Sequence, residues 1–381
     1  MIKQAVILAA GEGKRMKRSA TEETIIITPK PLIEINGLPI IEHSIRKLNY
    51  MGFDIAVVIN KKDEDIFRQK LKEYNIHYYY QEKPLGTANA LYSAKDFIKD
   101  DYFLVMMGDD LSNFNVEEII NIENPVIFGY EVEDLSKFGA IIMDAKGIAC
   151  EIVEKKQKGR GLANTGVYIM PKTFFDMYSN IKMDQKENEF YLTDFIKMMY
   201  DMGNGFEVKL MSYWRPINDF EELRKAKEDL AKFDYLSMKI RRATIRDLPE
   251  LLKILYQLSP LENIEDCKKN DINKVFNKIA GNEDYYLMLA EIDGQIIATA
   301  TLLIQQNLSH HARPYGHIEN VVTDYRFRGF GIGMIIVNYL LGIAGIKNCY
   351  KVILNCQEKN VDFYKKCGFE KTGEIELRAN L

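Results

Sequence analysis

The chain has 381 residues and a mass of 44.1 kDa, which predicts two or three domains, since one domain usually takes roughly 100–200 residues. Hydrophobic residues make up 47% of the chain and charged residues 28%, a composition that excludes disordered and collagen-like proteins. The formal net charge is −4 and the pI about 5.9. This argues against a general binder of nucleic acid or anionic membranes, because phosphate-backbone affinity needs a basic face.

The five cysteines are odd in number and scattered, and no C-x-x-C pair occurs. The sequence therefore supports neither a zinc site nor a disulfide framework. No stretch approaches the ~18 uninterrupted apolar residues of a membrane-spanning helix, and the chain enters a strand-like segment at 5–8 without a signal-peptide pattern. We therefore expect a cytoplasmic protein.

In the first part of the chain, short apolar segments alternate with helical patterns. Strands are predicted over 4–10, 54–60, 101–107, 125–132 and 164–170, and helices over 39–51, 62–74, 86–98, 190–201 and 220–236. This alternation predicts a layered α/β fold with a mostly parallel sheet. Ligands of such sheets bind beyond the carboxyl ends of the strands.

The pattern restarts near residue 238, and no Gly/Ser-rich linker precedes it. We therefore expect two units, 1–235 and 238–381, that are held close together. In the second unit, strands are predicted over 239–243, 285–292, 296–304, 316–323 and 350–356, and helices over 246–258, 331–345 and 358–367.

A glycine-rich segment, Gly11-Glu12-Gly13, follows the first predicted strand. Its glycines let the backbone approach phosphates, and Arg15 adds a planar cation for a polyphosphate. A lone G-x-G is weak evidence, because many turns look the same. Six further segments follow in order: Thr28-Pro29-Lys30, the stretch 81–90, Gly108-Asp109-Asp110, Val153-Glu154-Lys155, Asn164-Thr165-Gly166 and the stretch 214–218.

In that order, these motifs resemble the sugar-1-phosphate nucleotidyltransferase family over nearly all of residues 1–230. The resemblance implies a Rossmann-like, GT-A-like mixed-sheet domain in which a sugar phosphate attacks the α-phosphorus of an NTP and pyrophosphate leaves. The matching positions imply that the triphosphate is bound by Ala10, Gly11, Gly13 and Arg15, and the base by Gln81, Gly86 and Thr87. They imply that the sugar phosphate is bound by Gly139, Glu154, Lys155 and Asn164. Arg15 and Lys30 would be catalytic, and Asp109 and Asn218 would ligate Mg²⁺.

Some features leave alternatives open. Most members of that family carry an acidic residue two places after the tryptophan, where this chain has Pro216. The second metal ligand is therefore assigned to Asn218, with Asp219 as the alternative. Taken alone, Asp109 could be a simple turn residue. UTP, dTTP and CTP all stay open as the nucleotide, because Gln81, Gly86 and Thr87 do not define the base.

The second unit contains an Arg-x-x-Gly-x-Gly motif from Arg328 to Gly333, between an apolar strand and a helix. Backbone N–H groups at such a helix start form an anion site that suits a pyrophosphate. Together with the segments 240–248 and 360–369, this motif resembles the GNAT N-acetyltransferases, which have an α+β fold. The segments 317–322 and 349–356 are similar to the glucosamine-6-phosphate N-acetyltransferases, although Asn355 stands where those usually have Asp.

The resemblance implies residue roles in the second unit. The backbone of Val321 and Val322 would bind the pantetheine arm, and Tyr364 would protonate the departing thiolate. Glu319 would act as a base toward the amine through a water. Acetyl-CoA binding is further implied for Arg328, Gly329, Gly331, Gly333 and Asn360. His310, His311 and His317 crowd one stretch, where a solvated loop is favoured over a metal site.

The two units together predict a bifunctional enzyme that makes an activated N-acetylamino sugar, with UDP-N-acetylglucosamine as the expected product. It would use Mg²⁺, acetyl-CoA and an NTP, UTP first among the candidates. The alternatives are a CTP-dependent phosphocholine cytidylyltransferase-like or other sugar-nucleotide activity beside an acetyltransferase for another amine, or one degenerate unit that serves as a ligand sensor. Acetylation of a 6-phosphate or a 1-phosphate, and a homodimer formed through the GNAT unit, stay open.

Overall fold

The computed structural model describes residues 2–11, 13, 16, 28–114, 119, 122–154, 157–258 and 269–374. Within them, nine strands of the first unit form one mixed sheet in the order β5-β4-β1-β6-β11-β8-β12-β10-β9. These strands are β1 (Gln4–Leu8), β4 (Asp54–Ile59), β5 (Ile76–Tyr80), β6 (Tyr102–Met107), β8 (Val126–Val132), β9 (Gly139–Met143), β10 (Ile148–Glu154), β11 (Gly161–Pro171) and β12 (Phe206–Leu210).

One half of this sheet is parallel. β1 pairs in parallel with β4 on one side and with β6 on the other, and β5 continues the sheet beyond β4. All five residues of β1 are buried, as expected for a parallel strand that is covered on both faces. The strand order reverses between β1 and β6, which is the point where sheets of this kind bind ligands.

The other half differs from the mostly parallel sheet that the alternation predicted. β11 runs antiparallel to β6 and β8, and β10 runs antiparallel to β9 and β12. The prediction missed β9, β10 and β12. In β10 and β12, polar residues such as Glu151 and Lys209 interrupt the apolar pattern. The family resemblance, which implies a mixed sheet, agrees with the structure.

The longer helices of the first unit are α2 (Ile40–Tyr50), α3 (Glu64–Lys70), α4 (Thr87–Tyr92), α6 (Leu192–Asp201) and α7 (Phe220–Lys232). Three of them are clearly shorter than predicted. α3 ends at Lys70, inside the predicted range 62–74. α4 ends at Tyr92, before a separate 3-10 turn at Lys95–Phe97. α7 ends at Lys232, because Phe233 is extended and its ring enters the core.

The second unit has a five-stranded sheet in the order β14-β15-β16-β17-β18. Its strands are β14 (Lys239–Arg242), β15 (Tyr285–Ile292), β16 (Gln295–Gln305), β17 (Tyr315–Thr323) and β18 (Val352–Leu354), and its longer helices are α8 (Leu248–Leu255), α9 (Lys269–Ala280), α11 (Ile332–Ile346) and α12 (Val361–Lys366). The pattern analysis missed α9, although Ile272, Val275, Phe276 and Ile279 recur at helical spacing. β17 and β18 are parallel, whereas the other neighbours are antiparallel.

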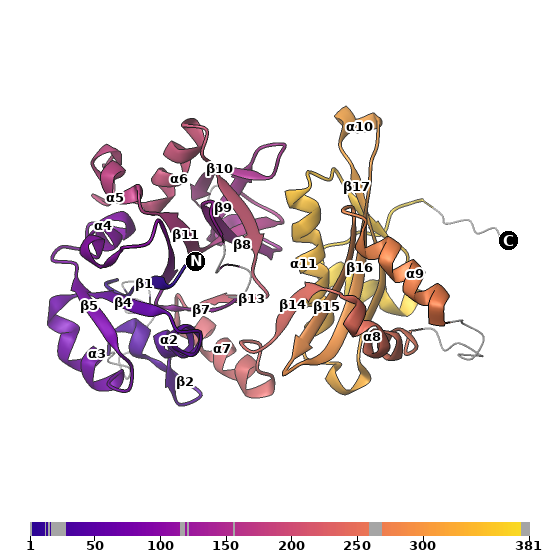
Figure 1. Ribbon diagram of the computed structural model, residues 1–381, viewed down its shortest axis with the longest axis horizontal. Coiled ribbons are helices and arrows are strands. Elements are labelled where there is room, and N and C mark those ends of the chain that lie inside the picture. Colours follow the sequence, from indigo (N-terminus) through magenta and orange to yellow (C-terminus); the bar gives the residue numbers. More distant parts are fainter. Residues whose placement is uncertain are drawn as a thin grey trace.

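The two units meet along α11, which has no charged residue in its 15 positions. A helix that is apolar all round is buried on all sides. α11 lies between its own sheet and strands β8, β11 and β12 of the first unit (Figure 1). At Gly342, an added Cβ would lie 2.9 Å from the methyl groups of Leu210, so this glycine permits the close approach of β12. In the described part of the chain, no helix is long and apolar enough to cross a membrane.

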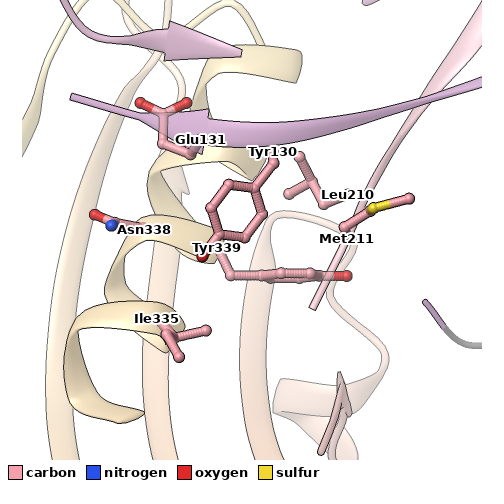
Figure 2. Close-up of a pocket in the computed structure, with 7 residues that line it drawn as sticks. All are labelled: Tyr130, Glu131, Leu210, Met211, Ile335, Asn338 and Tyr339. Carbon is pink, nitrogen blue, oxygen red and sulfur yellow. The ribbon is translucent and has the colours of Figure 1, made fainter. Parts of the chain in front are cut away.

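A small cavity of about 10 Å³ lies in this seam. Figure 2 shows Tyr130 of β8 and Tyr339 of α11 in the cavity wall, together with Asn338 of α11. The lining residues are Tyr130, Glu131, Leu210, Met211, Ile335, Asn338 and Tyr339. A space of this size holds one water at most, and none of its lining residues belongs to either predicted site.

Candidate active sites

The first candidate site lies where β1 and β6 end side by side. The Gly108 N–H donates to the Leu8 carbonyl at 2.9 Å, and a Cβ on Gly108 would lie 3.2 Å from that of Ala9. The Ala10 carbonyl accepts a 2.8 Å hydrogen bond from the Asn60 side chain at the end of β4. The loop that carries Gly11 and Gly13 therefore leaves the sheet beside the turn that carries Asp109.

Lys30 and Asp109 form an ion pair at this point. Lys30 Nζ lies 2.5 Å from Asp109 Oδ2, with the lysine side chain 9% exposed and the aspartate 36% exposed. Gly13 has a φ of +62°, and a Cβ there would lie 3.6 Å from Lys30 Cβ. The structure thus brings together a glycine of the phosphate loop, a cation and a carboxylate. Arg15 lies outside the described residues.

A two-stranded ladder leads the chain toward Asn218. β7 (Asp110–Asn113) pairs with β13 (Tyr213–Pro216), and Pro216 lies opposite Asp110. The ladder therefore leads toward Asp109 just as the chain enters Ile217 and Asn218. Asp219 is engaged elsewhere, because its carboxylate accepts from the Glu222 N–H at 2.9 Å and caps α7.

Asp110 holds this ladder together, a role that sequence reasoning missed. Its carboxylate accepts from Trp214 Nε1 at 3.1 Å and from the backbone N–H of Ile217. Burial, and then the charge of Asp109, raises the pKa of Asp110. Trp214, to which the motif assigned no chemistry, is therefore part of the support under the metal-ligand candidates.

The donor set at Asp109 fits Mg²⁺. Across the described residues, no group of three or more His, Cys, Asp or Glu side chains is arranged to hold a metal. Mg²⁺ does not require such a group, because it usually binds one or two carboxylates and keeps water and substrate phosphates as its other ligands. The Asp109 carboxylate and the Asn218 amide oxygen would be hard oxygen donors beside the glycine loop.

The predicted base-binding residues gather at the end of β5. Gln81 is 5% exposed, and its Nε2 donates to the Gly86 carbonyl and to Asn89 Oδ1, both at 3.0 Å. Gly86 has a φ of +90°, and a Cβ there would lie 2.5 Å from the Phe190 carbonyl oxygen. The Thr87 hydroxyl accepts from the Leu192 N–H at 3.1 Å. These contacts fix the orientation of the Gln81 amide, because a carbonyl oxygen can only accept.

Three of the four predicted sugar-phosphate residues are neighbours across the ladder of the antiparallel half. Glu154 of β10 lies opposite Gly139 of β9, and the pairing of Ala163 with Ala140 places Asn164 of β11 on the other side of Gly139. A Cβ on Gly139 would lie 2.8 Å from Glu154 Oε1. Asn164 Nδ2 donates to the Tyr168 hydroxyl at 2.8 Å. The fourth residue, Lys155, lies outside the described residues.

The second candidate site lies where β17 separates from β18. The two strands pair only from Gly316 to Ile318, so the later residues of β17 face outward on that side. Opposite them, the β16–β17 register shifts between Thr299 and Thr301, where Asn320 takes a φ of +53°. The backbone of Val321 and Val322 therefore follows a bulge at a strand edge, which leaves main-chain groups for a ligand.

The Arg-x-x-Gly-x-Gly loop follows β17 directly. Gly329 and Gly331 have φ values of +86° and +76°, a conformation that favours glycine. A Cβ on Gly333 would lie 3.2 Å from Thr323 Oγ1 and 3.3 Å from the Phe363 ring, so this glycine lets α11, β17 and α12 meet. Arg328 is exposed, and its Nε donates to the Thr323 carbonyl at 3.0 Å.

Tyr364 lies on α12, next to that junction. Burial is the main cause that raises the pKa of Tyr364 to about 12, so its hydroxyl keeps its proton at neutral pH. Glu319 is 59% exposed and lies 3.7 Å from His317 Nε2. Asn360 is exposed at the start of α12. His310 stacks on Tyr350 with ring centroids 3.9 Å apart.

Comparisons with known proteins agree with both halves of this description. The family model described as nucleotidyl transferase matches residues 4–232. The chain belongs to the nucleotidyl transferase family. A second model, described as the acetyltransferase (GNAT) family, matches residues 249–369. The chain thus carries a nucleotidyl transferase match followed by a GNAT match, in the order that the motifs predicted.

Similar proteins cover parts of the chain. "Bifunctional protein GlmU" of Methanococcus maripaludis strain C5 is 34% identical over 216 residues, which is 56% of this chain and 51% of that protein. The chain therefore spans about half the length of the curated relatives it matches. A crystal structure from Bacillus anthracis, provisionally assigned as a glucose-1-phosphate thymidylyltransferase, is 25% identical, with a TM-score of 0.52 over 61% of this chain and 96% of that one. A glucosamine-6-phosphate N-acetyltransferase structure from Arabidopsis thaliana is 31% identical over 38% of this chain and 97% of that one, with a TM-score of 0.35.

Proposed function

We propose that the chain is a bifunctional enzyme of activated amino-sugar synthesis. The GNAT domain would acetylate the amino group of a glucosamine phosphate with acetyl-CoA. The nucleotidyltransferase domain would transfer a nucleotidyl group, from UTP, to N-acetylglucosamine 1-phosphate, giving UDP-N-acetylglucosamine and pyrophosphate. The observation that carries the proposal is that the nucleotidyl transferase and GNAT family models match successive parts of one chain, residues 4–232 and 249–369.

In the first reaction, an oxygen of the sugar phosphate attacks the α-phosphorus, and the bond to the β-phosphate oxygen breaks. Positioning and charge neutralisation supply most of the catalysis in such a displacement. Gly11 and Gly13 would hold the triphosphate with their backbone N–H groups, and Lys30 would turn its charge from Asp109 toward the phosphates. Mg²⁺, held by Asp109 and Asn218, would neutralise charge on the phosphate oxygens.

Gln81 favours a base with an N–H at position 3. Both hydrogens of its amide nitrogen are donated to the chain, so Oε1 remains as the group that can accept. Uracil and thymine present an N3–H donor, whereas N3 of cytosine is an acceptor and would face Oε1 without a proton. This supports UTP or dTTP over CTP, and it disfavours the alternative of a phosphocholine cytidylyltransferase.

The sugar-phosphate side fits a hydroxylated sugar. Glu154 and Asn164 flank Gly139, which presents backbone without a side chain. A carboxylate and an amide on either side of a bare backbone can bind several hydroxyl groups, or the amide of an N-acetyl group. Lys155, adjacent to Glu154, would contact the sugar phosphate.

In the second reaction, the sugar amine attacks the thioester carbonyl carbon, and the bond to sulfur breaks. The Tyr364 hydroxyl would give its proton to the departing thiolate, and Glu319 would take a proton from the amine through a water. The raised pKa of Tyr364 keeps the acid form available at neutral pH. The bulged edge at Val321 and Val322 would orient the acyl carrier.

The deciding experiment measures pyrophosphate release with Mg²⁺ for each NTP against N-acetylglucosamine 1-phosphate, glucosamine 1-phosphate and phosphocholine. Turnover with UTP and the acetylated sugar supports the proposal and places acetylation first. Turnover only with CTP and phosphocholine contradicts it. The substrate of the GNAT domain is identified by a second assay, in which acetyl-CoA is offered with glucosamine 6-phosphate or glucosamine 1-phosphate and the release of free CoA thiol is measured. A domain that is inactive with every substrate but still binds its ligand would fit a sensor.

A further inference from the structure

The segment between α7 and β14 is buried. Phe233 and Tyr235 are 9% and 7% exposed, and Met238 is fully buried. The Asn113 side chain, at the end of β7, donates to the Tyr235 carbonyl at 3.0 Å and also to the Met238 carbonyl. A simple tether between domains would be solvated and would lack such bonds. This segment is instead fixed to both domains.

Its two aromatic residues lie against the loop that is proposed to bind the pyrophosphate of CoA. The Phe233 ring packs on Phe327 and Phe330, with centroids 6.4 Å and 5.7 Å apart. The Tyr235 hydroxyl donates to the Phe330 carbonyl oxygen at 2.5 Å. Phe330 stands between Gly329 and Gly331, so both contacts act at the centre of the Arg328–Gly333 motif.

The hydrogen bond to the Phe330 carbonyl fixes the orientation of the whole Phe330–Gly331 peptide. The Phe330 C=O and the Gly331 N–H belong to one planar trans peptide, in which they point in opposite directions. With the carbonyl turned inward to Tyr235, the Gly331 N–H is turned to the other side of the loop. Gly331 is exposed there, at the N-terminus of α11, where N–H groups have no acceptor within the helix.

We infer that Tyr235 is a positioning residue for the acetyl-CoA pyrophosphate, acting by orienting the Phe330–Gly331 peptide so that the Gly331 N–H faces the phosphates. The inference rests on the proposed function of the GNAT domain. It extends that function, because the residue belongs to the connecting segment and not to the Arg-x-x-Gly-x-Gly motif. The acetyltransferase site is thus partly built by a residue that the nucleotidyltransferase domain holds in place.

The nucleotidyltransferase domain orients Tyr235 through Tyr213. The two rings stack with centroids 5.1 Å apart and an angle of 9° between planes, and Tyr213 belongs to β13. The Tyr235 hydroxyl remains a donor over the physiological range, because burial raises its pKa to about 12. The Tyr235 hydroxyl therefore donates its one hydrogen bond to the Phe330 carbonyl.

The test compares full-length wild type with Tyr235→Phe, which keeps the ring and removes the hydroxyl. Titration calorimetry should show the Kd for acetyl-CoA rising about 5–10-fold, the loss expected for one hydrogen bond. Acetyl transfer to glucosamine 6-phosphate should show a raised KM for acetyl-CoA with kcat nearly unchanged. Transfer from acetyl-pantetheine, which lacks the pyrophosphate, should stay at the wild-type rate.

The matched control is Tyr50→Phe, which removes the hydroxyl of a tyrosine that is 89% exposed at the end of α2. This residue belongs to neither proposed site, so acetyl-CoA binding should not change. The inference is overturned if Tyr235→Phe binds acetyl-CoA as the wild type does. It is also overturned if acetyl-pantetheine turnover falls as much as acetyl-CoA turnover, which would indicate a general loss of structure. A wild type that binds no acetyl-CoA would instead refute the proposed function on which the inference depends.

Discussion

The residues of the proposed nucleotide site follow the ends of β1, β5, β6 and β13, which belong to two different sheets, so the fold brings together residues that are far apart in the sequence. The proposed acetyl-CoA site is built from β17, the loop 328–333 and α12, all within residues 315–366, and its shape depends on local backbone conformation at Asn320, Gly329 and Gly331. The first site should therefore be sensitive to the loss of single charged side chains. The second should be sensitive to groups that hold its backbone, some of which belong to the first domain.

The largest effect is expected at Asp109. Asp109→Ala removes the proposed metal carboxylate and leaves Lys30, which is 9% exposed, without its partner. Pyrophosphate release should fall by about 10²–10³-fold, the usual cost of losing one preorganised charge-stabilising group. Acetyl transfer by the same preparation should be unchanged. Retention of pyrophosphate release would show that Asp109 is only a turn residue, and loss of both activities would show that the sites are not independent.

The corresponding change in the second site is Tyr364→Phe. Without a proton donor for the thiolate, kcat for acetyl transfer should fall about 10²-fold, while the KM for acetyl-CoA changes little. Tyr325→Phe, at a tyrosine that is 67% exposed in the same domain, serves as the matched control. If Tyr364→Phe has the wild-type kcat, Tyr364 is not a catalytic residue and serves only as a core aromatic.

A smaller effect is expected from Gly139→Ala. The new methyl would lie 2.8 Å from Glu154 Oε1, so the carboxylate must move from its place between the strands. We expect the KM for the sugar phosphate to rise about 10-fold, with the KM for the NTP unchanged. Gly345→Ala, at a helical position with open space around it, should alter neither constant. Equal increases for both substrates would mean that Gly139 supports the sheet and not the sugar site.

The sequence predicts those site residues whose roles depend on local backbone conformation, and it does not predict those whose roles depend on contacts between distant parts of the chain. Gly13, Gly86 and Gly331 could be predicted because their backbone conformations favour glycine, and Asp109 because it follows a buried strand. Asp110 and Tyr235 could not, since their roles depend on which distant carbonyl or N–H group the fold brings within reach. The contact between the two domains could also have been predicted from the sequence. α11 is a 15-residue helix with no charged residue, so it needs a second covering surface besides its own sheet.

This seam allows a fourth effect, on stability and not on activity, to be tested as a pH dependence. Glu131, on β8, is 7% exposed, and burial raises its pKa to about 7 despite the Arg160 guanidinium 3.4 Å away. Its pKa in the unfolded chain is near 4.5, so between these two values the folded protein holds a proton that the unfolded chain has released. The stability that this proton contributes is complete below about pH 4.5 and is lost as pH rises through 7.

Glu131→Gln mimics the protonated side chain at every pH. Its free energy of unfolding should therefore increase relative to that of the wild type by about 2 kcal/mol between pH 4.5 and 8, as measured by urea denaturation at each pH. Glu133→Gln makes the same substitution at a residue that is 59% exposed and 4.0 Å from the same arginine, and should move the stability curve far less, because an exposed pair is screened by solvent. If the two variants change stability alike, the Glu131–Arg160 contact is as solvated as the surface, and the tight seam around α11 does not persist in solution.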